Sequence, residues 1–194
     1  MSSKHSQSEP VDKEFLLSMY GQMFNNINRH ILIIWQTLGV VVGAFALLGL
    51  TKSSLLPLDF SASLIVLLCG WLFSHCEDAS AWYNRNHAII CEIENQFLTN
   101  GELGRIKGLF GKPRPDNKMV RHFRLQKMLG LGIMITVIMY HLTVELAPAI
   151  KIGISETSIP NWLPYLALVF SLYYPSTIKK SADAKYHKLI ANKE

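Results

Sequence analysis

Two ionisable side chains, His141 and Glu145, lie four residues apart in an otherwise apolar stretch of the chain. In a helix, residues at this spacing are neighbours on one face. Ionisable groups inside a bilayer are costly unless they face one another, the interior of a helix bundle or water. The pair therefore predicts either a mutual hydrogen bond in a bundle interior or, together with Gln36 and Thr37 on an earlier apolar stretch, a candidate ion path.

A second group of charges follows the apolar stretch that ends near Ser74. An antiparallel helix that aligned Met128 with Ser74 would bring Arg124 and Lys127 close to Asp78. Charge pairs at such a boundary commonly hold helices together. We expect an interhelical Asp78–Arg124 pair, with a gate or a proton site as the alternative.

Trp82, Arg85 and Asn86 combine an aromatic ring, a guanidinium and an amide within about one helical turn. These groups could hydrogen-bond between helices or subunits, or hold an anionic ligand. We expect these residues to make contacts between helices or subunits, and we expect the same of Glu94 on the same stretch.

The chain also contains thiol, imidazole and carboxylate groups close together, at His75, Cys76, Glu77, Asp78 and Cys91. None of these residues has the Cys-x2-Cys or His-x3-His spacing of typical ligand pairs, so we expect no metal site. The sequence also has no catalytic triad order, nucleophile elbow or Walker loop. It therefore predicts a protein without enzyme activity and without a cofactor.

The elements that position these residues are expected to be membrane-spanning helices. The 194-residue chain is 49% hydrophobic and 17% charged, which is apolar for a soluble protein. Charges are absent from long blocks, and a helix of about 20 apolar residues crosses about 30 Å of hydrocarbon. We predict an all-α, four-span transmembrane helical bundle, with spans at 31–50, 60–74, 128–146 and 162–178.

The second and third spans are expected to continue as helices beyond the membrane. Residues 64–100 contain no proline, and their apolar positions keep a three-and-four spacing that indicates one continuous helix. Residues 117–146 predict a second helix that returns to cover its apolar stripe. The expected organisation is a cytoplasmic N-terminal segment with an amphipathic helix (1–30), spans 1 and 2 (31–75), a cytoplasmic antiparallel helical hairpin with a basic loop (76–127), spans 3 and 4 (128–178) and a basic cytoplasmic tail (179–194).

The distribution of Lys and Arg predicts the orientation. The segments before the first span, between the second and third spans, and after the fourth span hold 3, 9 and 5 of these residues, whereas the two remaining loops hold one each. Cytoplasmic loops carry the excess of basic residues in membrane proteins. Both termini and the hairpin are therefore expected in the cytoplasm, and residues 148–160 are expected to form an external loop.

Eight Lys and Arg residues lie within the 23 residues from Arg105 to Lys127. Such a cluster beside a membrane favours contact with anionic lipid head groups, and a soluble cytoplasmic protein could use the same charges. No aromatic-interleaved or groove-reading pattern accompanies the cluster, so we do not expect direct nucleic-acid binding. The residues expected to make lipid or partner contacts are Arg105, Lys107, Lys112, Arg114, Lys118 and Arg121.

A longer pattern, W-x6-D-x3-WYNRN-x2-II-x2-IE-x2-FL, surrounds Trp82. It resembles the signature of a mostly uncharacterised family of small, multi-spanning bacterial inner-membrane proteins. The similarity to compact membrane proteins that act as sensors or effectors in anti-phage defence is looser. This resemblance implies an inner-membrane location and supplies no catalytic residue. The residues that carry it are Trp71, Asp78, Trp82, Tyr83, Asn84, Arg85, Asn86, Ile89, Ile90, Ile93, Glu94, Phe97 and Leu98.

Two hypotheses for the function follow, and both involve a homo-oligomer. Gly39 and Gly43 form a GxxxG motif, which can let two helix backbones approach closely within a subunit or between subunits. The first hypothesis is a channel-like or membrane-perturbing effector, including one in anti-phage defence. The alternative is a membrane anchor or sensor that recruits a soluble cytoplasmic partner through its basic hairpin.

Overall fold

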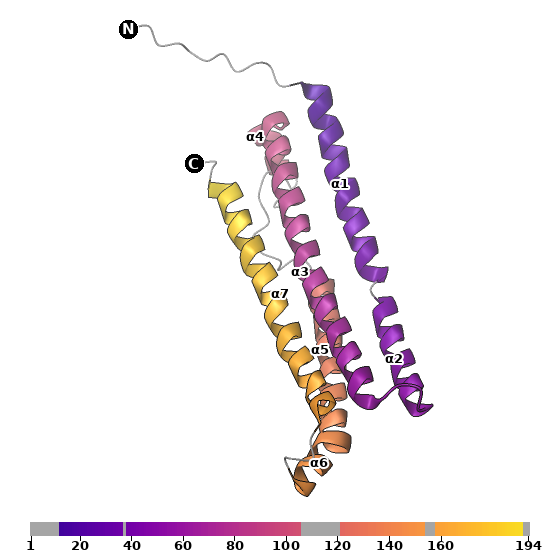
Figure 1. Ribbon diagram of the computed structural model, residues 1–194. Helices are drawn as coiled ribbons and strands as arrows, with labels where there is room; N and C mark the ends of the chain where they lie inside the picture. Colours follow the sequence, from indigo (N-terminus) through magenta and orange to yellow (C-terminus); the bar gives the residue numbers. More distant parts are fainter. Residues whose placement is uncertain (1–11, 37, 106–120, 154–157, 192–194) are drawn as a thin grey trace.

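The computed structural model describes residues 12–36, 38–105, 121–153 and 158–191. Every element in these ranges is a helix, so the predicted all-α class is confirmed. The start of α1 and the end of α7 lie at one end of the molecule, and the α2–α3 turn and α6 lie at the other (Figure 1). The elements are α1 (Lys13–Gln36), α2 (Leu38–Lys52), α3 (Leu58–Phe97), α4 (Asn100–Arg105), α5 (Arg121–His141), the π-helical turn η2 (Leu142–Leu146), α6 (Ala147–Ile152) and α7 (Ile159–Ala191).

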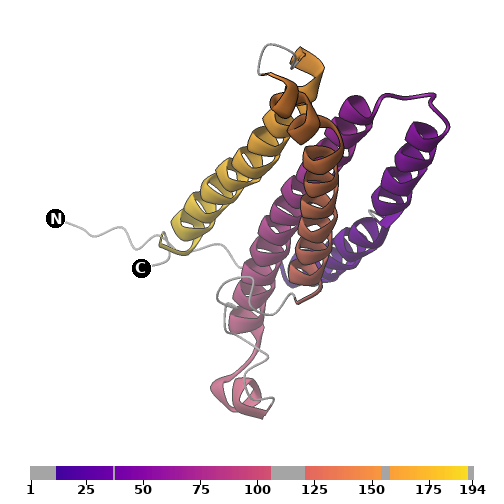
Figure 2. The same ribbon diagram turned by 90° about the horizontal axis from the view of Figure 1, so that it is seen from below.

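Helix α3 is the axis of the fold. It runs unbroken for 40 residues, as the sequence predicts, and at about 1.5 Å per residue it is about 60 Å long. It starts directly after Pro57 and ends where Leu98 takes an extended conformation. In both views α3 lies between α7 on one side and α1 and α2 on the other (Figures 1 and 2). Its first half packs with α2, α5 and α7, and its second half packs with α1 and α7.

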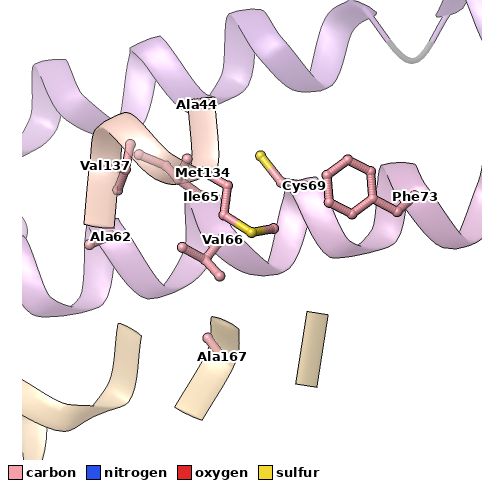
Figure 3. Close-up of a cluster of buried hydrophobic side chains, with 9 residues drawn as sticks. All are labelled: Ala44, Ala62, Ile65, Val66, Cys69, Phe73, Met134, Val137 and Ala167. Carbon is pink, nitrogen blue, oxygen red and sulfur yellow. The ribbon is translucent and has the colours of Figure 1, made fainter. Parts of the chain in front are cut away.

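The first half of α3 forms the main apolar core with α2, α5 and α7. Ile65 and Val66 of α3 are fully buried, and Met134 of α5 packs among the same side chains. These residues gather around α3 in Figure 3. Burial of a Leu- or Ile-sized side chain stabilises a fold by about 1.5–3 kcal/mol. The core residues are Ala44, Ala62, Ile65, Val66, Cys69, Phe73, Met134, Val137 and Ala167.

Helices α3 and α7 approach closely at Gly70. A Cβ atom at this position would overlap both the side chain and the backbone of Ser171. The Ser171 hydroxyl donates a hydrogen bond to the Val66 carbonyl oxygen at 3.1 Å, across the same contact. At the predicted GxxxG positions, Gly39 and Gly43, a Cβ would meet nothing within 4 Å. Gly70 therefore takes part in close packing within the subunit, whereas Gly39 and Gly43 do not.

Helix α1 is longer than predicted. We predicted an amphipathic helix within residues 1–30 and a separate span at 31–50, but α1 continues to Gln36 and α2 begins at Leu38. Thr37 lies outside the described residues. Helix α1 lies beside the second half of α3, where the Tyr20 hydroxyl donates to the Glu94 carboxylate at 3.0 Å. One face of α1, which includes the buried Ile27, therefore packs against the protein itself, whereas Phe15 and Leu17 remain exposed.

Among the described residues, the second half of α3 is covered by α1 and α7, and residues 117–120 of the predicted hairpin partner lie outside them. Helix α5 reaches only the middle of α3, where Phe123 packs against Leu72, Cys76 and Ala79. An apolar stripe that projects from a membrane needs cover from water. Two other helices supply it, so the described part of this region is a three-helix arrangement of α1, α3 and α7.

The predicted loop at 148–160 begins later in the structure. After His141 the chain passes through η2 into α6 and remains helical to Ile152. Pro148 lies in the first turn of α6, where its missing N–H is tolerated. That N–H would otherwise bond to the Val144 carbonyl, so the hydrogen-bond ladder is interrupted where the π turn forms.

Helix α7 joins the predicted fourth span and the predicted tail. It extends from Ile159 to Ala191 with Pro164 and Pro175 inside it. Pro175 removes one helical hydrogen bond, which normally kinks or ends a helix. Because α7 packs along α3 on both sides of this proline, tertiary contacts maintain the helix through residues 179–191.

Two described stretches, Leu58–Phe97 and Phe123–Lys151, are long and apolar enough to cross a membrane by length and composition. They support association with a membrane. The predicted first span is divided between α1 and α2, and its second part, Val41–Lys52, is a shorter apolar helix. Prolines, tyrosines and serines lower the mean hydropathy of the apolar half of α7. The finer prediction of four spans is taken up below as a proposal.

Candidate functional site

Four polar side chains from three helices meet at the end of the molecule that holds the α2–α3 turn. They are Asp59 of α3, His141 of α5, and Asn161 and Tyr165 of α7, and we name them the His141 cluster. His141 Nε2 lies 2.8 Å from Asp59 Oδ1, and Asn161 Nδ2 donates to the same oxygen at 3.2 Å. His141 Nδ1 lies 3.2 Å from the Tyr165 hydroxyl. The His141 side chain is fully buried and that of Asp59 is 16% exposed.

A buried histidine–carboxylate pair can hold or release a proton. With Nε2 donating to Asp59, Nδ1 accepts from Tyr165 when the imidazole is neutral and donates to it when the imidazole is charged. The π turn η2 follows His141 directly, and such turns are frequent at functional sites. The cluster therefore connects α3, α5 and α7 through hydrogen bonds whose direction depends on the tautomer of His141.

The predicted His141–Glu145 pair is wrong, because both ring nitrogens of His141 face other residues. Glu145 lies half-buried in η2. A π turn has more residues per turn than an α-helix, so residues four apart no longer align there. The remaining residues of the candidate ion path stay predictions, because Thr37 and the side chain of Gln36 lie outside the described part of the chain.

Sequence reasoning missed Asp59, Asn161 and Tyr165. The available signal was position: Asp59 is the last residue of the predicted loop between the first two spans, and Tyr165 lies near the start of the fourth span. In the predicted topology, both of these helix starts are on the same side of the membrane as His141. An acid at that level is the partner a membrane histidine requires.

The ion pair between α3 and α5 joins Glu77 to Lys127. The predicted partners, Asp78 and Arg124, are both exposed. One residue along a helix is a rotation of about 100°, so a contact face that includes Cys76 and Glu77 turns Asp78 away. The Cys76 thiol lies 3.6 Å from Gln126 Oε1 on this same face.

Asp78 instead lines a groove between α3 and α7, with a volume of about 770 Å³. We name it the α3/α7 groove. The Arg85 guanidinium lies over the Trp82 ring, 5.0 Å from its centroid, as a cation–π pair. The groove therefore combines cations with aromatic surface. Its lining residues are Asp78, Ala81, Trp82, Arg85, Tyr174, Thr177, Ile178, Ser181, Ala182, Lys185 and Tyr186.

The structure separates the two neighbours Arg85 and Asn86. Arg85 is exposed in the α3/α7 groove, whereas Asn86 is 2% exposed on another face of α3. Its Nδ2 has no hydrogen-bond acceptor among the described residues. The predicted anion site made of both residues is therefore not formed, and Arg85 alone is placed where it can meet a ligand.

Glu94 is buried and its interhelical contact is with Tyr20 of α1. Burial raises the pKa of the Tyr20 hydroxyl from 10.0 to about 12, and the hydrogen bond to Glu94 adds to this effect. Both causes favour the neutral phenol. The contact therefore connects α1 to α3 as long as Tyr20 keeps its proton.

The six residues predicted to contact lipid or a partner lie outside the described region, either entirely or through their side chains. Their contacts stay predictions. They are Arg105, Lys107, Lys112, Arg114, Lys118 and Arg121.

Among the described residues, no three His, Cys, Asp or Glu side chains gather where they could hold a metal ion. Cys69, Cys76 and Cys91 are buried free thiols. Comparison with protein-family models, curated proteins and solved structures finds no match. The geometry of the described residues therefore gives two candidate sites, the His141 cluster and the α3/α7 groove.

Proposed function

We propose that this chain is a four-span bacterial inner-membrane protein that serves as an anchor or sensor for a soluble cytoplasmic partner. The observation that carries the membrane part is an inverted distribution of side chains. Ser61, His141 and Ser171 are at most 1% exposed, whereas Leu166 and Val169 on α7 are 63% and 67% exposed. A water-soluble bundle buries the apolar residues and exposes the polar ones. Lipid reverses this preference.

The arrangement of helix ends supports an even number of crossings. The start of α1 and the end of α7 lie at one end of the molecule, and the α2–α3 turn and α6 lie at the other (Figure 1). Basic residues are concentrated in the three segments expected at the first end. The positive-inside rule then puts that end in the cytoplasm.

The role of anchor or sensor is favoured because the polar residues are engaged within one subunit. A channel would place His141 on a wetted path, but His141 is turned toward Asp59 and Tyr165. The two candidate sites also share their helices: α3 carries Asp59 and Arg85, and α7 carries Tyr165 and Lys185. A shift of α3 against α7 at one site would therefore change the other site.

A channel-like or membrane-perturbing effector, including one of an anti-phage system, is the second proposal. One observation favours it: a Cβ at Gly39 or Gly43 would meet nothing within 4 Å. This motif can therefore serve a second copy of the chain, and an oligomer could form a path that a single subunit lacks.

Topology and ion leak distinguish these proposals. A reporter enzyme that is active only outside the cytoplasm should be silent when fused at Asn100 or after Glu194 and active when fused at Ser54. Activity at Asn100 would overturn the four-span topology. Proteoliposomes of an anchor should show no ion leak above empty liposomes. Leak that Glu145→Ala changes at equal protein content would instead favour the channel.

Recruitment is tested on the basic segment. Neutralising Lys118, Arg121 and Arg124 together should release a cytoplasmic protein that co-purifies with the wild type, because rim charges steer such contacts. Neutralising Lys179, Lys180 and Lys188, three exposed lysines on α7, is the matched control. Equal loss in both variants would contradict specific recruitment through the basic segment.

A further inference from the structure

The α3/α7 groove has the charge and shape of a ligand site that no part of the proposed function uses. Arg85 and Lys185 supply two cations and Asp78 supplies one anion. In the described part of the chain, none of these three has an ion-pair partner. The net charge of the lining is therefore +1, which one singly charged anion would neutralise.

The position of the groove relates it to the membrane surface. Asp78 lies four residues beyond the predicted end of the second span, and Tyr174 lies within the last turns of the fourth. Lys185 is seven residues beyond that span, or on the order of 10 Å along the helix. The groove thus begins at the inner boundary of the bilayer and extends through the depth of the head groups.

An apolar strip leads along α7 to the membrane end of the groove. Val169, Phe170 and Tyr173 are 67%, 56% and 68% exposed. They precede Tyr174, which lines the groove. A molecule with a charged head and a hydrocarbon chain could lie with its chain on this strip and its head between Arg85 and Lys185.

We propose that the α3/α7 groove binds the phosphate head group of an anionic phospholipid from the inner leaflet. The inference rests on the proposed topology. The Arg85 guanidinium offers paired donors to the phosphate and Lys185 a point charge. The Ser181 hydroxyl can bond to the rest of the head group, and Thr177 Oγ1, which donates to the Tyr174 carbonyl oxygen, can accept from it. A zwitterionic lipid would leave the net positive charge uncompensated, so an anionic lipid such as phosphatidylglycerol fits best.

The test follows Trp82 fluorescence in the full-length protein, with Trp35, Trp71 and Trp162 replaced by Phe. Titration with short-chain phosphatidylglycerol in neutral detergent should give a saturable change. Arg85→Gln and Lys185→Gln should each weaken binding about fivefold, since a basic residue near a membrane surface contributes about 1 kcal/mol. Lys188→Gln removes an exposed charge of the same helix outside the groove and should leave binding unchanged. An equal effect of Lys188→Gln would overturn the site.

Two ligand controls identify the occupant. Glycerol 3-phosphate has the phosphate without the chains and should bind at least tenfold more weakly, as should short-chain phosphatidylethanolamine. Equal binding of glycerol 3-phosphate would identify a soluble phosphate ester and overturn the lipid proposal, and equal binding of phosphatidylethanolamine would overturn the selectivity for anions. A Trp82 signal that changes with protein concentration alone would identify a second copy of the chain as the occupant.

Two further measurements distinguish loss of lipid binding from loss of folding or of membrane insertion. Arg85→Lys keeps the charge but not the paired donors, and it should bind between wild type and Arg85→Gln at an unchanged melting temperature. Membrane fractionation of each variant tests the topology independently. Loss of lipid binding by a protein that stays in the membrane supports the groove. Absence of the wild type from the membrane would overturn the topology itself.

Discussion

His141 Nε2 and Asp59 Oδ1 lie 2.8 Å apart, although 82 residues separate them in the chain. The contact joins the first turn of α3 to the last residue of α5, and Tyr165 extends it to α7. The apolar core in Figure 3 joins the same three helices through buried apolar side chains. Burial of the contact between His141 and Asp59 makes each partner costly to lose.

Removal of either partner alone should therefore destabilise the bundle strongly, and removal of both should cost less than the sum of the two single losses. Asp59→Ala leaves a buried imidazole without its acceptor and should cost on the order of 3 kcal/mol, as should His141→Ala. The double variant should lose less than the sum of the single losses in thermal melting in detergent. Asp59→Asn keeps an acceptor oxygen and should lose less than Asp59→Ala. Strict additivity would show that the two residues do not interact.

The contact between Gly70 and Ser171 predicts a position-specific effect of a single methyl group. Gly70→Ala should destabilise the α3–α7 packing by about 1–3 kcal/mol, because the added Cβ overlaps Ser171 backbone as well as side chain. Gly132→Ala is the matched control, since nothing lies within 4 Å of its Cβ. It should leave the melting temperature unchanged or raise it slightly through helix propensity. Equal melting of the two variants would contradict this packing.

The Glu77–Lys127 pair should respond to charge exchange. Glu77→Lys and Lys127→Glu each place like charges together and should each lower stability, by roughly 1 kcal/mol because Lys127 is 33% exposed and partly screened. The double exchange should recover most of this loss. The same exchange at Asp78 and Arg124, which are exposed, should show no coupling. Recovery at Asp78 and Arg124 but not at Glu77 and Lys127 would favour the ion pair predicted from the sequence.

The contact of Tyr20 with Glu94 predicts a loss of stability at high pH. The pKa of Tyr20 is raised from 10.0 to about 12 in the folded protein. A raised pKa favours the protonated form, so this contribution is fully present below pH 10 and is lost between pH 10 and about 12. In an ultraviolet titration, Tyr20→Phe should remove one late-ionising tyrosine. An unchanged late phase would indicate that Tyr20 titrates normally.

The sequence by itself determined the features that depend on local pattern. Apolar spacing of three and four residues specifies helix wherever it occurs, so the all-α class and the unbroken α3 follow from residues 64–100 alone. The uneven distribution of Lys and Arg is likewise a property of the chain order and predicts an orientation before any contact is known.

Only the tertiary structure decided which faces meet, because periodicity marks a face and does not name the helix that covers it. The α3 stripe could be covered by several amphipathic helices, and α1 and α7 cover it. A rotation of about 100° per residue is enough to exchange Asp78 for Glu77 as the partner of α5. His141 contacts an acid from the first turn of α3 instead of its neighbour Glu145, because long-range packing and the π turn set its direction.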